Sequence, residues 1–302
     1  MRRVLITGAG GFVGRRVATL LQDGGARVAT VGRSEGGGPL HFAFGPAPWT
    51  CEQWQTALDA SEPDIIFHLA GTTHGAANDF EAVNVGLAEG LFSALRRLGA
   101  QPDLLLAGSA AEYGDAIVDG AAVEEDLLCQ PRGEYGRSKL AQTMSALAFG
   151  EETGAKVLVA RLFNPIGSGM PPNLALSDFA RQISGPDHVL TTGNLDVSRD
   201  FMDVSSTAAA LVALAKRPGA RGVVNVCSGA ATNLRRIVER LLLCSGKMMR
   251  IVVDPARLRP GEPRIIIGST AKLASLGVAS PGLDIDRVAV ALLADAQMRA
   301  RM

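Results

Sequence analysis

The sequence has no excess of charge of either sign, because 30 lysine and arginine side chains balance 30 aspartate and glutamate side chains. A nucleic-acid-binding protein ordinarily carries a strongly basic surface that pairs with phosphates. The balance therefore argues against a nucleic-acid partner. It also indicates that any basic group with a binding role acts singly.

Cysteine is scarce as well. Cys51, Cys129, Cys227 and Cys244 show neither Cys-x-x-Cys spacing nor a neighbouring cluster of histidines. Four cysteines in a chain of 302 residues do not make a disulfide scaffold. We expect reduced, buried thiols and no metal site.

Long apolar runs are also missing. No segment approaches the run of about 18 apolar residues that indicates a membrane span. The two arginines near the start lead directly into a strand and a glycine-rich turn, not into the apolar core of a signal peptide. We expect no membrane partner and a cytoplasmic location.

What the chain does contain begins with a glycine-rich turn. Residues 4–7 form a short apolar run, residues 15–22 have helical periodicity, and Gly8, Gly11 and Gly14 lie between them at spacings of three. A strand, a glycine turn and a helix in this order form a dinucleotide fingerprint, in which amides at the helix N-terminus meet a pyrophosphate. The alternative is a tight turn that binds nothing.

The end of the second expected strand bears on the choice of cofactor. The strand at residues 27–31 is followed by Gly32-Arg33-Ser34. An acidic residue here would bind the ribose 2′-hydroxyl of NAD, whereas an arginine can pair with the 2′-phosphate of NADP. Arg33 therefore favours NADP, with NAD still possible, and the alternative is a solvated loop charge.

Strands alternate with helices through about residue 165, which predicts an α/β fold built on a Rossmann-type doubly wound parallel sheet. We expect an NAD(P)-binding domain over residues 1–165. A smaller substrate-binding α/β lobe is expected over residues 166–302, with segments near 196–230 returning to the first domain. Carboxyl ends of parallel strands are where such sheets bind ligands.

Tyr135 and Lys139 lie four residues apart, so on a helix their side chains share one face. Because a free tyrosine has a pKa of about 10, it is a weak acid–base group at neutral pH. A cation one turn away is expected to lower the pKa of Tyr135 toward neutrality. The alternative is a half-exposed helix with Lys139 at its surface.

Together these motifs resemble the extended short-chain dehydrogenases/reductases, a group of sugar-nucleotide epimerases, dehydratases and reductases. The resemblance covers nearly the whole chain. Segments at residues 193–204 and 254–268 are most similar to GDP-4-keto-6-deoxy-D-mannose reductases. The motifs are Thr7-Gly8-x-x-Gly11-x-x-Gly14, His68-Leu69-Ala70, Ser109-Ala-Ala-Glu-Tyr113-Gly114, Tyr135-x-x-x-Lys139, Arg161-x-Phe163-Asn164-Pro165-x-Gly167 and Arg199-Asp200-Phe201.

The resemblance implies a role for each matching residue. Tyr135 would be the catalytic acid–base, Lys139 would tune it and bind the nicotinamide ribose, and Ser109 would hydrogen-bond the sugar oxygen being reduced. Besides Arg33, Tyr135 and Lys139, the implied cofactor contacts are Gly8, Gly11, Phe12, Val13, Gly14, Leu69, Ala70, Gly71 and Phe163.

Substrate contacts are implied in the same way. Arg199 matches a position that approaches the diphosphate of a nucleotide sugar, and an ion pair with Asp200 is the alternative. Arg259 and Glu262 match nucleotide contacts, with a surface ion pair as the alternative. The full implied set is Ser109, Asn164, Arg199, Arg259 and Glu262. His68, Asn84 and Glu112 are interpreted as structural.

The residues after Ser109 bear on the reaction. Ala110 and Ala111 stand where the dehydratases carry an Asp-Glu or Ser-Glu pair, and a methyl group cannot move a proton. Reduction needs only Ser109, Tyr135 and Lys139 with a bound nicotinamide. We therefore expect NAD(P)H-dependent reduction of the 4-keto group of a nucleotide-linked 4-keto-6-deoxyhexose.

Two other functions stay open. A nucleotide-sugar 4-epimerase with retained NAD uses the same three groups, and a non-catalytic NAD(P)-binding regulator is a weaker alternative. The resemblance also implies a homodimer, because two long helices pair across a dimer in the group and the expected helices near residues 81–98 and 135–151 are apolar enough to do so. The alternative is a monomer in which those faces are covered.

Overall fold

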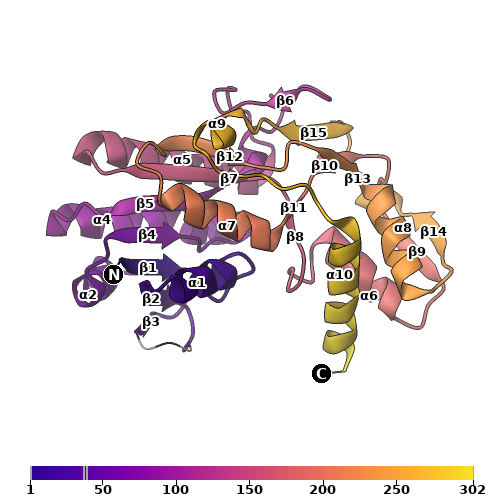
Figure 1. Ribbon diagram of the computed structural model, residues 1–302, viewed down its shortest axis with the longest axis horizontal. Helices are drawn as coiled ribbons and strands as arrows, with labels where there is room; N and C mark the ends of the chain where they lie inside the picture. The colour runs from indigo at the N-terminus through magenta and orange to yellow at the C-terminus, as the bar shows by residue number, and fades with distance from the viewer. Residues whose placement is uncertain (1, 37, 39, 302) are drawn as a thin grey trace.

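The computed structural model describes residues 2–36, 38 and 40–301. Its largest element is a seven-stranded sheet in the order β12-β7-β5-β4-β1-β2-β3, in which every neighbouring pair is parallel (Figure 1). The strands are β1 (Arg3–Thr7), β2 (Arg27–Gly32), β3 (His41–Ala43), β4 (Ile65–His68), β5 (Asp103–Ser109), β7 (Val157–Leu162) and β12 (Gly222–Val226).

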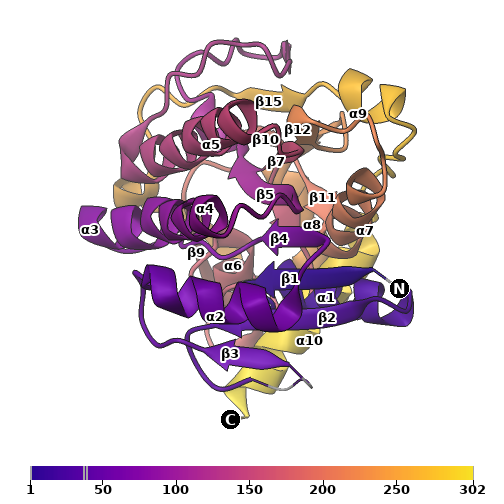
Figure 2. The same ribbon diagram turned by 90° about the vertical axis from the view of Figure 1, so that its left-hand side faces the viewer.

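Helices cover both faces of this sheet (Figure 2). Strand β1 shows how the sequence produces the arrangement: Val4 and Ile6 join one hydrophobic core, and Leu5 joins the other. Successive strand residues point to opposite faces, so a sheet buried on both sides needs a continuous apolar run. One face packs on α1 (Gly14–Asp23) and α7 (Val204–Ala215), and the other on α2 (Cys51–Ser61), α4 (Leu87–Leu98) and α5 (Gly133–Thr153).

A second lobe occupies the right half of Figure 1, where α6 (Ala175–Ser184), α8 (Leu234–Ser245) and α10 (Ile285–Ala300) share a core. It also contains a four-stranded sheet, β13-β10-β15-β6, and the strand pairs β11–β8 and β14–β9. These strands are β6 (Ala122–Val123), β8 (Pro165–Ile166), β9 (Val189–Thr192), β10 (Ser198–Asp200), β11 (Met202–Asp203), β13 (Ala231–Asn233), β14 (Arg250–Val253) and β15 (Ile265–Gly268).

Short helical segments complete the description. A π-helical segment, η1 (Glu81–Gly86), connects α3 (Ala77–Phe80) to α4, and a 3-10 turn, η2 (Ala110–Glu112), follows β5 directly. The 3-10 turn η3 (Pro255–Arg257) and the helix α9 (Ala271–Ser275) lie near the C-terminal end. Among the described residues, no helix combines the length and the apolarity needed to cross a bilayer.

The parallel sheet with helices on both faces confirms the predicted doubly wound α/β fold. The chain passes between the lobes more than once: α7 and β12 return to the main sheet after β10 and β11, and β6 pairs with β15. The division into domains at residue 165 stays a prediction. The helix expected around Tyr135 and Lys139 is α5, which contains both residues.

Candidate active site

The glycine-rich turn connects β1 to α1 at the carboxyl edge of the main sheet. Gly8 has a φ of +70°, and a Cβ there would come within 2.7 Å of the backbone nitrogen of Ala70. A Cβ on Gly14 would overlap the carbonyl oxygen of Gly8. Both positions therefore require glycine. The close approach allows Thr7 to accept hydrogen bonds from the amides of Leu69, at 3.2 Å, and Ala70, at 3.1 Å.

The same turn ends in a helix N-terminus that no side chain caps. Val13 is the N-cap residue of α1 and makes no side-chain hydrogen bond to the first turn. Within the turn, the amide of Gly11 donates to the carbonyl of Gly8 over 2.9 Å. Uncapped amides and the positive end of a helix dipole suit an anion. This geometry fits the pyrophosphate of a dinucleotide.

The side chains of the other predicted cofactor residues differ in where they pack and in how exposed they are. The side chain of Phe12 packs on the core of the second lobe, and that of Val13 on the main core. At Gly71 a Cβ would lie 3.2 Å from the Asn84 side-chain oxygen. Phe163 is fully buried in a small cluster, so only its backbone could reach a ligand. Arg33 is exposed after β2, and none of the ion pairs among the described residues involves it.

The predicted catalytic residues come from two adjacent elements. Ser109 ends β5, and its Oγ accepts a hydrogen bond from the amide of Ala111 at 3.2 Å. Tyr135 is half-buried in the first turn of α5, close enough to Ser109 for that side chain to lower the pKa of the phenol. Lys139 is buried one turn further along, where its Nζ donates to the carbonyl of Ala107 on β5 and to the side-chain oxygen of Gln142.

The electrostatics correct one sequence-based expectation. Burial raises the pKa of Tyr135, opposed by its hydrogen bond with Ser109, whereas the sequence predicted a pKa lowered by Lys139. The main reason is the burial of the phenol itself. The Lys139 ammonium donates to Ala107 and Gln142, and burial lowers the pKa of Lys139 to about 8. Before a ligand binds, the site therefore favours a neutral phenol.

The predicted phosphate-binding arginine has an acidic partner. The Nη2 of Arg199 lies 2.9 Å from Oε2 of Glu262, and both side chains are largely buried. The alternatives of an Arg199–Asp200 pair and an Arg259–Glu262 pair are therefore wrong for this structure. Arg259 is exposed and close enough to Arg199 to lower its pKa, although burial lowers it more. Arg199, Arg259 and Glu262 thus lie together.

Asn164 and Asp200 form a second group at the boundary of the lobes. Asn164 has a φ of +29° and donates from Nδ2 to the backbone oxygen of Asp200 over 2.8 Å. Asp200 is buried, which raises the pKa of its carboxyl, and it accepts hydrogen bonds from the amides of Ser228 and Gly229. Its role is to join segments of the second lobe.

Residues interpreted as structural from the sequence are buried here. His68 contacts the Thr7 hydroxyl through Nδ1 at 3.2 Å, and burial lowers its pKa to about 3, so the ring is neutral. Asn84 lies in η1, where its Oδ1 accepts from the amide of Thr72 and its Nδ2 donates to Oγ of Ser138 over 2.9 Å. Ser138 lies on α5 between the two predicted catalytic residues, so Asn84 ties η1 to that helix.

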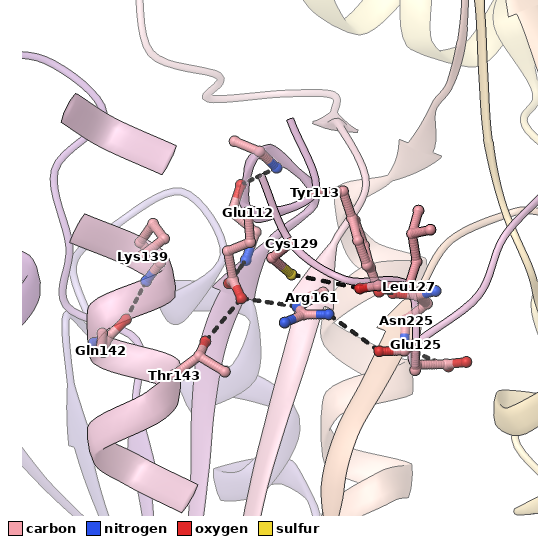
Figure 3. A network of polar contacts seen from close by, with 12 residues as sticks. Glu112, Tyr113, Glu125, Leu127, Cys129, Lys139, Gln142, Thr143, Arg161 and Asn225 are labelled. Atoms are coloured by element: carbon pink, nitrogen blue, oxygen red, sulfur yellow. Dashed lines mark hydrogen bonds and ion pairs between the residues drawn. The ribbon is translucent and has the colours of Figure 1, made fainter. Parts of the chain in front are cut away.

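Sequence reasoning missed two polar partners of Glu112, which are Arg161 and Thr143 (Figure 3). Arg161 on β7 forms a buried ion pair with Glu112, with Nε 2.8 Å from Oε2. The Oγ1 of Thr143 on α5 donates to the same carboxylate oxygen. One signal was available: an arginine inside an apolar strand requires a buried acceptor.

A model of the NAD dependent epimerase/dehydratase family matches residues 4–227. The chain belongs to this family. GDP-6-deoxy-D-mannose reductase of Pseudomonas aeruginosa is 30% identical to this chain and covers 99% of both sequences. The dTDP-6-deoxy-L-talose 4-dehydrogenase (NAD(P)(+)) of Kitasatospora kifunensis is 30% identical, over 84% of this chain and 82% of that one.

Solved structures of the epimerase/dehydratase family agree with this assignment. RMD from Pseudomonas aeruginosa, solved as a complex with NADPH, superposes with a TM-score of 0.82 at 30% identity, covering 99% of this chain and 100% of that chain. A putative epimerase from Burkholderia cenocepacia superposes with a TM-score of 0.86 at 27% identity. The resemblance to extended short-chain dehydrogenases/reductases is confirmed.

Proposed function

We propose that this family member is an NAD(P)H-dependent reductase that acts on the 4-keto group of a nucleotide-linked 4-keto-6-deoxyhexose, in the manner of GDP-6-deoxy-D-mannose reductase. The observation that carries the proposal is the meeting of Ser109, Tyr135 and Lys139 from β5 and α5, beside alanines at positions 110 and 111. The three polar groups suffice for reduction, and the two methyl groups cannot perform the proton transfers of a dehydratase.

The proton chemistry follows from the pKa directions. A bound nicotinamide would supply the hydride to the carbonyl carbon. Because burial raises the pKa of Tyr135, the phenol is protonated at neutral pH and can donate its proton to the sugar oxygen. The hydroxyl of Ser109 holds the same oxygen. Lys139, with a pKa of about 8, is mostly protonated at neutral pH and can stabilise the phenolate that Tyr135 leaves.

The residues that would hold the cofactor fit a dinucleotide. The turn at residues 8–14 and the uncapped N-terminus of α1 suit the pyrophosphate. We propose that Lys139 binds the nicotinamide ribose and that the exposed Arg33 pairs with a 2′-phosphate. We therefore propose NADPH as the preferred cofactor, with NADH as a possible substitute.

The second lobe offers a binding group for the nucleotide diphosphate. Arg199 presents a largely buried guanidinium that is already paired with the Glu262 carboxylate. A diphosphate carries more negative charge than one carboxylate, so it would compete for Arg199, with the exposed Arg259 adding a second cation. Asn164 would contact the sugar from the boundary between the lobes.

The decisive experiment is to incubate the purified protein with NADPH and a panel of nucleotide-linked 4-keto-6-deoxysugars, and to follow the loss of reduced-cofactor absorbance. We expect turnover with at least one 4-keto sugar and formation of the corresponding alcohol. NADPH that stays unconsumed with every panel member would contradict the proposal.

A 4-epimerase remains the second candidate, because epimerases use the same three polar groups. An epimerase retains NAD after purification and interconverts fully reduced sugars without consuming NADPH, so the same assay separates the two functions. The cytoplasmic location, the homodimer through α4 and α5, and the domain boundary at residue 165 remain predictions of the sequence.

A further inference from the structure

A fully buried carboxylate lies directly behind the proposed active site. Glu112 ends η2, three residues after Ser109, and its side chain is 0% exposed. Figure 3 shows that groups from three elements converge on it. Its Oε1 accepts from the backbone amide of Ser109 at 2.8 Å, and its Oε2 accepts from Thr143 Oγ1 at 3.0 Å and from Arg161 Nε at 2.8 Å.

This carboxylate joins the two elements that carry the catalytic groups. Ser109 is the last residue of β5, and Thr143 lies one turn beyond Lys139 on α5. The Lys139 ammonium also donates to Ala107 on β5. Strand and helix are therefore tied at two points, and the place of the Ser109 hydroxyl relative to α5 depends on Glu112.

The neighbouring backbone leaves room for this contact. A Cβ on Gly108 would lie 2.8 Å from Oε1 of Glu112 and 2.8 Å from Cγ1 of Val159. Only glycine at position 108 lets the Glu112 side chain fold back onto the Ser109 amide. The position of the Glu112 side chain thus depends on Gly108 in β5 as well as on the ion pair with Arg161.

The charge of Glu112 also reaches the proposed acid–base pair. Burial lowers the pKa of Lys139, and the negative charge of Glu112 raises it by a smaller amount. For Tyr135, burial raises the pKa and the charge of Glu112 raises it further. Other titratable or charged groups face this region from the packed elements. They are His68 on β4, Tyr113 and Glu125 near β6, Cys129 in the segment before α5, and Arg161 on β7.

We infer that Glu112 is a positioning residue of the proposed reductase: its carboxylate, held by Arg161 and Thr143, fixes Ser109 relative to α5 and keeps a negative charge beside Lys139. The kinetic part of this inference rests on the proposed function, whereas the structural part does not. Because its side chain is 0% exposed, Glu112 would touch neither cofactor nor sugar and would act through Ser109 and Lys139.

The first test needs no substrate. The chain has five lysines, Lys139, Lys156, Lys216, Lys247 and Lys272, so the protein labelled with ¹³C at lysine Cε gives few NMR signals, and Lys139→Met assigns one of them. Glu112→Gln keeps the shape but removes the charge. Burial lowers the pKa of Lys139 to about 8. We expect the titration midpoint of Lys139 to be lower in Glu112→Gln than in the wild type by roughly half a pH unit or more.

Glu124→Gln is the matched control, because Glu124 is exposed and close in sequence. It makes the same charge change without touching the site, so the Lys139 midpoint should not move. An unchanged midpoint in Glu112→Gln, or an equal shift in both variants, would overturn the role of the Glu112 charge.

The second test is kinetic. Glu112→Gln should lower kcat by roughly tenfold to a hundredfold, the reach of a misplaced catalytic group, with the KM for NADPH within about twofold of the wild type. If this variant does not fold, the kcat of Thr143→Val tests the positioning role instead. This substitution removes one hydrogen bond and leaves the ion pair intact.

For Thr143→Val we expect a kcat several-fold lower with the KM for NADPH nearly unchanged, and a Tm that falls by only a few degrees, because the Glu112 carboxylate loses one of its three donors. A wild-type kcat in either folded variant would disprove positioning. If the wild-type protein reduces no 4-keto sugar, the proposed function fails, and the Lys139 midpoint in Glu112→Gln still decides the inference.

Discussion

Tyr113 and Tyr135 are the two tyrosines of the chain. The surroundings of Tyr113 indicate a structural role, and those of Tyr135 a catalytic one. Tyr113 is fully buried, donates its hydroxyl to Asn225 at 2.7 Å, and lies under the Arg161 guanidinium. Tyr135 is half-buried beside the Ser109 hydroxyl. In both cases burial raises the pKa of the phenol, for Tyr113 to about 12, but only Tyr135 lies beside a polar group that could share a ligand.

Tyr135→Phe should therefore lower kcat by about a hundredfold or more, the usual effect of removing one positioned proton donor. The KM for NADPH should change little, because the phenyl ring still fills the same space against Phe80. The measurement is NADPH consumption with the preferred 4-keto sugar. Tyr113→Phe is the matched control: it should retain turnover and lose about 1–3 kcal/mol of unfolding free energy, because Asn225 is left without its donor. A Tyr135→Phe enzyme of normal rate would remove this residue from the mechanism.

The conformation of the turn between β1 and α1 depends on the absence of a Cβ atom at particular glycines. A Cβ on Gly14 would overlap the carbonyl of Gly8, whereas a Cβ on Gly10, in the same turn, would meet nothing within 4 Å. Gly14→Ala should cost about 2 kcal/mol or more of unfolding free energy, because backbone must move to admit the methyl group. Gly10→Ala should stay within about 0.5 kcal/mol of the wild type. Urea unfolding of the two variants checks this, and equal stabilities would show that the turn adjusts freely.

The glycine turn and the Tyr135–Lys139 pair could be predicted because their geometry is local. Three glycines after a strand, or two side chains one helical turn apart, have a fixed spatial relation once the element forms. The ion pairs could not be predicted in this way. Glu112 and Arg161 are 49 residues apart, and Arg199 and Glu262 are 63 apart.

Those partners meet only because of the order of the strands. Arg161 reaches Glu112 because β7 lies beside β5, and Arg199 reaches Glu262 because β10 pairs with β15. The wrong expectation for the pKa of Tyr135 has the same origin. Sequence spacing gave the position of Lys139 but neither the burial of the Tyr135 phenol nor the carbonyl of Ala107 that accepts from the Lys139 ammonium.

Across the whole molecule the charges cancel, so the net charge gives no general attraction for an anionic cofactor. Discrimination between NADPH and NADH, which differ by one phosphate, must then depend on individual cations. Arg33 is such a cation, exposed immediately beyond the carboxyl end of β2 and one strand away from the glycine turn.

Arg33→Ser should therefore raise the KM for NADPH about tenfold or more, since a charge-assisted hydrogen bond contributes about 1.5–3 kcal/mol. The KM for NADH should not change, because NADH lacks the 2′-phosphate. Arg27→Ser is the matched control, because Arg27 is an exposed arginine at the opposite end of the same strand. The substitution changes the net charge equally at a position remote from the proposed cofactor site.

Steady-state kinetics with both cofactors at a fixed 4-keto sugar concentration make the comparison. A rise for NADPH and NADH alike would indicate that Arg33 supports the loop rather than the phosphate, and an unchanged KM for NADPH would assign the phosphate to another residue.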